Sequence, residues 1–322
     1  MAAIPPIDLG AFLEGTAQEQ QDIAADVDDI CQRIGFLIVE QHGVPRQTVD
    51  AAWSACREFF ELPLAEKLKA RSPDPGCPRG YFPLATEALA GSLGVETPPD
   101  VKESFGVGPL RGPAAPIEDA AFEFHYGPNI WPDKPEHLRA ALTDYFNALA
   151  ALGSRVLRLF AAALQLPHDY FERFHVDPMC ALRCISYPAA AGSLLPDQRG
   201  AGEHADYGSI TILKSVPQVP GLVVRLPTGE WLAAPLVDDG FIVNIGDMMA
   251  RWTNDRWVST LHRVSNPPES RRRQSMAFFH NASFDAAIEC IPTCRDGQQP
   301  KYEPVRAGRY LNDRFNAALA TE

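Results

Sequence analysis

The sequence predicts an α+β fold whose core is a double-sheet jelly roll (double-stranded β-helix), flanked by N-terminal helices and one long central helix. Two observations predict it. Apolar residues recur at helical spacing before residue 180, and their period changes from 3.6 to 2 at Cys180. Short apolar runs separated by Gly or Pro turns then follow one another closely, which is typical of a jelly roll.

Helices are expected mainly in the first half of the chain. Apolar residues recur every three or four positions between Gln18 and Ile34, which predicts an amphipathic helix. A short strand over 36–40 and a second helix between Val44 and Pro63 follow it. The longest helix is predicted over 135–166, because proline stands near its start and just after its end. We expect three nearby histidines to be solvated: His137, His168 and His175.

The stretch from 71 to 100 is rich in Pro and Gly and is predicted to form a loop. Loops frequently line or cover a catalytic site. Residues 102–107 alternate in polarity and predict a strand.

Further strands are predicted in the second half of the chain. Arg183, Ile185 and Tyr187 share one face of a strand that Pro188 ends. The other predicted strands are short: 210–214, 222–226, 231–234, 241–244, 261–264 and 275–280. Because Ile7 and residues 36–39 are also strand-like, we expect them to join the same sheets. Residues 1–322 then form one domain, with N-terminal helices and loops over 1–110 and the jelly roll over 180–285.

Composition argues against several kinds of partner. The 322 residues carry a formal net charge of −12 and give a pI near 5.2, whereas binding to nucleic acid or anionic membranes needs clustered Lys and Arg. The hydrophobic content of 46% is ample for a buried core. The first residues lack a basic and apolar leader, so we expect a cytoplasmic protein that acts on a small molecule. We also expect a monomer.

Seven cysteines are scattered along the chain, and an odd number suits free thiols in a reducing compartment. Two pairs of cysteines, Cys180 with Cys184 and Cys290 with Cys294, could each supply half of the ligands of a zinc site. Neither pair has a pair of histidines near it in sequence, so we expect no structural zinc.

Two histidines and one aspartate form a candidate metal site. His204 and Asp206 lie two residues apart before the β-branched run 209–213, so in an extended strand both side chains point the same way. His262 follows the apolar run 241–245. Two neutral imidazoles and one carboxylate on one face of a metal leave its other positions open. This arrangement suits non-haem Fe(II) oxygenases.

Arg273 and Ser275 add an anion clamp, because the period of a strand places the guanidinium beside the hydroxyl. Each piece also has an ordinary explanation: a solvated His-x-Asp pair, a structural histidine, and a basic surface run over 271–273. Their joint occurrence in this order, within strand and turn sequences, favours a functional site.

These segments resemble the signature of the isopenicillin N synthase-like family of iron(II) and 2-oxoglutarate-dependent oxygenases. The resembling segments are 204–213, 221–224, 243–247, 261–264 and 273–275. Residues 4–9 and 35–45 resemble the family's N-terminal region, so the similarity covers nearly the whole chain.

The resemblance implies roles for individual residues. The implied iron ligands are His204, Asp206 and His262. The implied contacts to 2-oxoglutarate are Arg273, Ser275 and Tyr187. Many relatives place an asparagine two residues before that tyrosine, where this chain has Ile185. Arg183 or a water molecule is expected to replace the missing contact.

The implied reaction is oxidative decarboxylation of 2-oxoglutarate to succinate and carbon dioxide, with dioxygen as second co-substrate and ascorbate as a stimulant. It removes a hydrogen atom from a small molecule, such as an amino acid or an intermediate of secondary metabolism, and leads to hydroxylation, desaturation or ring closure. Candidate substrate contacts are Tyr81, Phe82, Phe105 and Phe279. Core packing explains the first three equally well.

Three other functions stay open at this point. An oxidase like isopenicillin N synthase uses iron and dioxygen without 2-oxoglutarate, and holds its substrate's carboxylate with the Arg-x-Ser pair. An ethylene-forming enzyme consumes 2-oxoglutarate itself. A non-catalytic, ligand-binding jelly roll is allowed by the fold alone, but it has no need of both the triad and the clamp.

Overall fold

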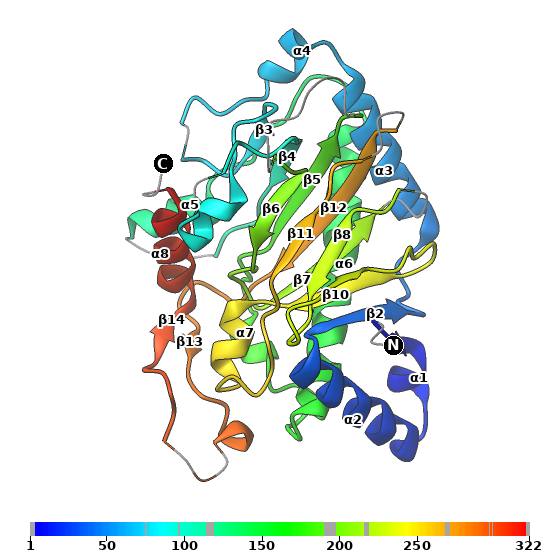
Figure 1. The fold of residues 1–322 in the computed structure, drawn as a ribbon, viewed down its shortest axis with the longest axis vertical. Coiled ribbons are helices and arrows are strands. Elements are labelled where there is room, and N and C mark those ends of the chain that lie inside the picture. Colours follow the sequence, from blue (N-terminus) through cyan, green and yellow to red (C-terminus); the bar gives the residue numbers. More distant parts are fainter. Residues whose placement is uncertain are drawn as a thin grey trace.

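Two stacked β-sheets with helices outside the larger one form the body of the protein (Figure 1). The computed structural model describes residues 4–74, 76–95, 97–113, 119–189, 198–215, 219–267, 271–295, 297 and 299–319. The predicted jelly-roll core is confirmed by this pair of sheets.

The larger sheet has eight strands drawn from both parts of the chain. In spatial order they are β1 (Pro6–Asp8), β2 (Phe36–Glu40), β10 (Phe241–Ile245), β7 (Ile210–Ser215), β12 (Arg273–His280), β5 (Ala181–Tyr187), β4 (Glu103–Val107) and β3 (Gly80–Phe82). The predicted strand boundaries hold to within about two residues for most of these. N-terminal strands therefore complete the sheet that carries the second half of the chain, as the strand-like sequence around Ile7 predicts.

The smaller sheet covers one face of the larger one. Its strands are β6 (Ala201–His204), β11 (His262–Val264), β8 (Leu222–Arg225) and β9 (Trp231–Ala233), all antiparallel. Apolar side chains of both sheets meet between them, among them Phe36, Ile242 and Val224. A separate pair, β13 (Ala287–Ile288) and β14 (Val305–Arg306), lies near the C-terminus.

Long helices cover the outer face of the larger sheet. They are α2 (Ala17–Arg33), α3 (Arg46–Glu61) and α6 (Leu138–Ala163). Phe146 of α6 packs edge-on against Phe278 of β12, with ring centroids 5.0 Å apart. Among the described residues, α6 is the one helix long and apolar enough to cross a membrane by length and composition. Of its most apolar window, 56% is buried inside the fold, as is common for a core helix.

Several elements escape the sequence prediction, and all but the 13-residue α8 are too short for periodicity to reveal. They are α1 (Leu9–Glu14), α4 (Leu64–Leu68), α5 (Ala120–Tyr126), α7 (Asp247–Trp252), α8 (Ala307–Leu319) and the 3₁₀ helices η1 (Leu89–Leu93), η2 (Glu172–Phe174) and η3 (Pro292–Cys294). The predicted loop over 71–100 thus contains a strand and a helical turn. Helix α8 lies beside α5 and contacts η1 (Figure 1).

The prediction that His175 is solvated is wrong. Its ring stacks on that of His280, with centroids 5.1 Å apart and an interplanar angle of 18°. Its Nδ1 donates to the Phe171 carbonyl at 2.9 Å, and its Nε2 is buried with no partner among the described residues. The turn η2 folds this histidine inward, and burial lowers its pKa to about 4. His137 and His168 are exposed, as predicted.

We expect the free energy of unfolding to fall as the pH is lowered from about 6.5 to about 4. Burial lowers the pKa of both His125 and His175 to about 4, so in this window the unfolded chain binds protons that the folded chain does not. Each histidine contributes a slope of about 1.4 kcal/mol per pH unit. Urea denaturation at a series of pH values measures it.

The substitution His175→Phe should reduce that slope, because it removes one of the buried histidines whose pKa is lowered. The matched control is His137→Gln, which removes a histidine whose side chain is 55% exposed and is measured at the same pH values. An equal slope in the parent protein and the His175 variant would contradict the lowered pKa that we assign to His175.

Candidate active site

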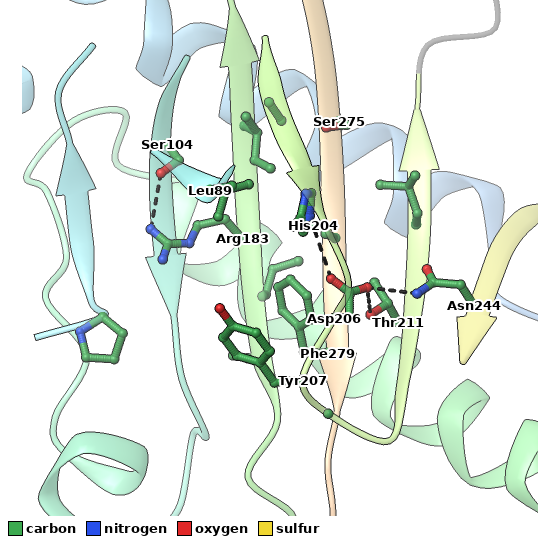
Figure 2. Close-up of a pocket in the computed structure, with 18 of the residues that line it drawn as sticks. Leu89, Ser104, Arg183, His204, Asp206, Tyr207, Thr211, Asn244, Ser275 and Phe279 are labelled. Atoms are coloured by element: carbon green, nitrogen blue, oxygen red, sulfur yellow. Dashed lines mark hydrogen bonds and ion pairs between the residues drawn. The ribbon is translucent and has the colours of Figure 1, made fainter. Parts of the chain in front are cut away.

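His204 and His262 face each other across two antiparallel strands. The register of β6 and β11 pairs them directly, and their ring centroids lie 4.4 Å apart. The Oδ1 atom of Asp206 lies 3.9 Å from Nε2 of His204 and 3.8 Å from Nε2 of His262. One ligand atom from each of the three residues lies within 4.8 Å of the others, so the structure brings the predicted triad together. Figure 2 shows two of its members, His204 and Asp206.

Asp206 does not share a strand with His204, so the predicted reason for their convergence is wrong. Strand β6 ends at His204, and Asp206 lies in the loop that leads to β7. Its Oδ2 accepts hydrogen bonds from Thr211 Oγ1 at 2.5 Å and from Asn244 Nδ2 at 2.8 Å (Figure 2). These donors belong to β7 and β10 of the larger sheet. They hold the carboxylate so that Oδ1 is left for the histidines.

The backbone sets the tautomer of both histidines. Nδ1 of His204 lies 2.8 Å from the Gly202 carbonyl, and Nδ1 of His262 lies 3.0 Å from the Thr260 carbonyl. Because a carbonyl only accepts, each Nδ1 carries the proton, and each Nε2 offers a lone pair toward Asp206.

The pKa shifts of His204 and Asp206 favour the binding of a cation by the triad. Burial, followed by the neighbouring imidazole of His262, lowers the pKa of His204. Burial acts to raise the pKa of Asp206, but the two imidazoles and the Asn244 and Thr211 hydrogen bonds outweigh it and lower the value. Neutral imidazoles beside one carboxylate are the donors that iron(II) takes in non-haem oxygenases. The residues present therefore fit a ferrous ion.

A cavity of about 240 Å³ lies beside the triad, between the sheets. Facing side chains of β5 and β12 line its floor in four register pairs: Tyr187 with Arg273, Ile185 with Ser275, Arg183 with Ala277, and Ala181 with Phe279. The predicted 2-oxoglutarate contacts thus gather at one end of the floor. Phe279 lies at the other end.

Of the charged side chains on this floor, Arg273 is the one whose buried guanidinium has nitrogens without a hydrogen-bond acceptor among the described residues. It is 1% exposed, and its guanidinium lies 4.7 Å above the Tyr187 ring. Its Nε and Nη1 have no hydrogen-bond partner within the described part of the chain. A buried guanidinium without an acceptor is costly, and a carboxylate satisfies it with two parallel hydrogen bonds. The end of the cavity at Arg273 therefore fits the distal carboxylate of 2-oxoglutarate.

The expectation that Arg183 or a water molecule replaces the asparagine contact stays a prediction, and in the structure Arg183 has other partners. Its Nη1 donates to Ser104 Oγ at 3.2 Å, and its Nη2 lies 3.5 Å from Glu87 Oε1. Its guanidinium also lies 4.2 Å above the Phe82 ring. These contacts direct Arg183 toward β4 and the loop before η1, as Figure 2 shows for Ser104.

The candidate substrate residues separate into two groups. Tyr81 and Phe105 are buried in the core, where the Tyr81 hydroxyl donates to Glu103 at 2.7 Å and Phe105 packs on Phe59. Those two and Phe82 do not line the cavity, whereas Phe279 does.

Several residues of the site were not predicted from the sequence. Tyr207 lines the cavity, and α8 contributes Leu311 and Phe315. Nothing in the sequence of α8 indicates that it covers a site. Asn244 does leave a signal, because an amide within the apolar run 241–245 needs a buried partner.

Two family models match separate parts of the chain. Residues 4–134 match the model described as non-haem dioxygenase in morphine synthesis N-terminal, and residues 176–282 match the 2OG-Fe(II) oxygenase superfamily. Homoarginine-6-hydroxylase 2-ODD-233 of Oryza sativa subsp. japonica is 32% identical over an alignment of 327 positions, which covers 96% of this chain and 95% of the relative. The chain belongs to the 2OG-Fe(II) oxygenase superfamily.

Solved structures agree with this assignment. A full-length Neurospora crassa protein in complex with alpha-KG matches with a TM-score of 0.84 and 31% identity, over 97% of this chain and 95% of that protein. JOX2 in complex with 2OG, Fe and JA matches with a TM-score of 0.79 and 26% identity, over 99% of this chain and 89% of JOX2. This 2OG-Fe(II) oxygenase is thus an oxidoreductase, a 2-oxoglutarate-dependent dioxygenase that uses iron and acts on a small molecule. The predicted class and cofactors are confirmed, and the non-catalytic and 2-oxoglutarate-independent alternatives are not supported.

We expect Asn244→Ala to weaken iron(II) binding by about 10- to 100-fold, the usual loss when a group that orients a metal ligand is removed. Asp206 loses one of the two donors that hold Oδ2. Anaerobic titration with Fe(II) measures the affinity. The control is Gln274→Met, because Gln274 donates a partly buried hydrogen bond to the Trp53 carbonyl on the other face of β12. Equal affinities for the Asn244 variant and the parent would refute this role.

Proposed function

We propose that this dioxygenase hydroxylates or desaturates a small molecule, with iron(II) held by His204, Asp206 and His262. In this proposal Arg273 holds the distal carboxylate of 2-oxoglutarate, with Ser275 and Tyr187 beside it. The main support is Arg273, which lies on the wall of the cavity that also contains the triad and whose buried Nε and Nη1 have no hydrogen-bond partner among the described residues.

Bound iron and 2-oxoglutarate supply the oxidising power, together with dioxygen. The chain's own residues bind, orient and exclude water. Asn244 and Thr211 hold one carboxylate oxygen of Asp206, so only the other faces the metal position. Apolar side chains make up most of the cavity lining, which keeps bulk water from the reacting carbon.

We propose that the substrate occupies the end of the floor beyond Ser275. Ala277 is small and lies opposite Arg183, and Phe279 and Tyr207 bound the same end of the cavity. Aromatic walls suit a flat or apolar body, while Arg183 offers a donor to a carbonyl or carboxylate oxygen. An amino acid or an intermediate of secondary metabolism fits this description. The names of the relatives above mention homoarginine and JA, both small molecules.

We further propose that the protein is a cytoplasmic monomer that binds neither nucleic acid nor membranes. The net charge of −12 supports the absence of nucleic-acid and anionic-membrane binding. Size-exclusion chromatography with light scattering tests the monomer, and a mass of two or more chains would contradict it.

We expect Arg273→Gln to raise the KM for 2-oxoglutarate by about 10- to 100-fold, because the charge-assisted pair with the distal carboxylate is lost. Succinate formation in the presence of iron and ascorbate, across a panel of amino acids and aromatic acids, measures it. Iron(II) affinity in the absence of 2-oxoglutarate should not change. The control is Arg263→Gln, since Arg263 lies over the Trp231 ring and does not line the cavity. An unchanged KM in the Arg273 variant would overturn the assignment of the clamp.

A further inference from the structure

A buried carboxylate covers the open edge of the strand that carries His204. Strand β6 is the outermost strand of the smaller sheet, and η1 packs along it. Asp100, which is 2% exposed, accepts a hydrogen bond from the Gly202 N–H at 2.9 Å through Oδ1. Its Oδ2 accepts from the Leu89 N–H at 3.1 Å and from Lys102 Nζ at 3.0 Å. One side chain therefore ties η1 to the edge of β6.

Gly202 connects this carboxylate to the metal site. Its N–H binds Asp100, and its carbonyl accepts the hydrogen bond from Nδ1 of His204. A Cβ at this position would lie 2.9 Å from the Ala90 nitrogen of η1, so only glycine allows the close approach. The backbone segment that orients His204 is thus held from outside by Asp100 and η1.

Buried charges continue from Asp100 toward the substrate end of the cavity. Lys102 is 5% exposed and lies 3.0 Å from Asp100 and 3.7 Å from Glu87, whose other oxygen lies 3.5 Å from Arg183. Lys102 thus compensates the charge of Asp100. Of these charged groups, Asp100 is the one whose hydrogen bond reaches the backbone of β6.

We propose that Asp100 is a positioning residue for the metal centre, because its bond to Gly202 holds β6 so that Nε2 of His204 faces Asp206. Lys102 acts differently: it stabilises the buried carboxylate without orienting the histidine. The inference rests on the proposed role of His204 as an iron ligand.

The test compares Fe(II) affinity and folding stability in three variants of the full chain. Asp100→Ala removes the acceptor for the Gly202 N–H and should weaken Fe(II) binding by about 10- to 100-fold. Asp100→Asn keeps an oxygen acceptor and should lose only a few-fold. Lys102→Met leaves a buried carboxylate without its cation, so it should lower stability. It should not weaken Fe(II) binding, because Lys102 lines the cavity and its positive charge acts on His204.

The matched control is Asp119→Ala. Asp119 also accepts a backbone hydrogen bond, from Ala121 at 2.9 Å, and pairs with Arg309, but it caps α5. Its loss should leave Fe(II) affinity unchanged. The visible spectrum of the Co(II)-loaded protein gives a second readout, because its bands report the geometry of the ligands. These bands should change in Asp100→Ala and not in Asp119→Ala.

Two results would overturn the proposal. One is a loss of Fe(II) affinity that is proportional to the loss of folding stability in every variant. The other is an unchanged Fe(II) affinity in Asp100→Ala. If Asp100→Ala does not fold, Gly202→Ala replaces it, since its Cβ meets Ala90 and must displace β6 from η1. Gly202→Ala should then lose affinity while Lys102→Met does not, and the opposite order would refute the role. His262→Ala separates the two proposals: if it binds Fe(II) as tightly as the parent, the proposed function itself fails.

Discussion

The buried carboxylate of Asp206 is the constraint on which the site depends. It is 8% exposed, and burying a carboxylate is costly unless hydrogen bonds and an opposite charge compensate it. Thr211 and Asn244 satisfy one oxygen, while the other faces two neutral imidazoles. A divalent cation between these three groups supplies the missing charge and explains why the chain keeps this arrangement in its interior.

The same carboxylate couples the two sheets. Its hydrogen bonds come from β7 and β10 of the larger sheet, whereas the imidazoles that face it stand on β6 and β11 of the smaller one. The stacking of the sheets and the geometry of the triad therefore depend on each other. At the floor of the cavity, β5 and β12 add Arg273 at one end and Phe279 at the other, so one pair of strands spans both the co-substrate and substrate positions.

Sequence patterns predicted the fold well wherever a strand or helix is long and regular. Alternation placed Arg273 and Ser275 on one face correctly because β12 is an eight-residue strand. Alternation gave the wrong reason for the position of the Asp206 carboxylate. Strand β6 ends at His204, and hydrogen bonds from other strands place the carboxylate. Periodicity also does not distinguish a core face from a cavity face, so it did not separate Phe105 from Phe279. The roles of Asp100 and of α8 depend on contacts between segments far apart in the chain.

The most direct test of this account is an anaerobic crystal structure of the protein with Fe(II) and 2-oxoglutarate. We expect iron at about 2.1 Å from Nε2 of His204 and of His262 and from Oδ1 of Asp206, a usual distance for such donors. The distal carboxylate of 2-oxoglutarate should accept hydrogen bonds from Arg273. Iron bound elsewhere, or a 2-oxoglutarate carboxylate that makes no contact with Arg273, would contradict the account.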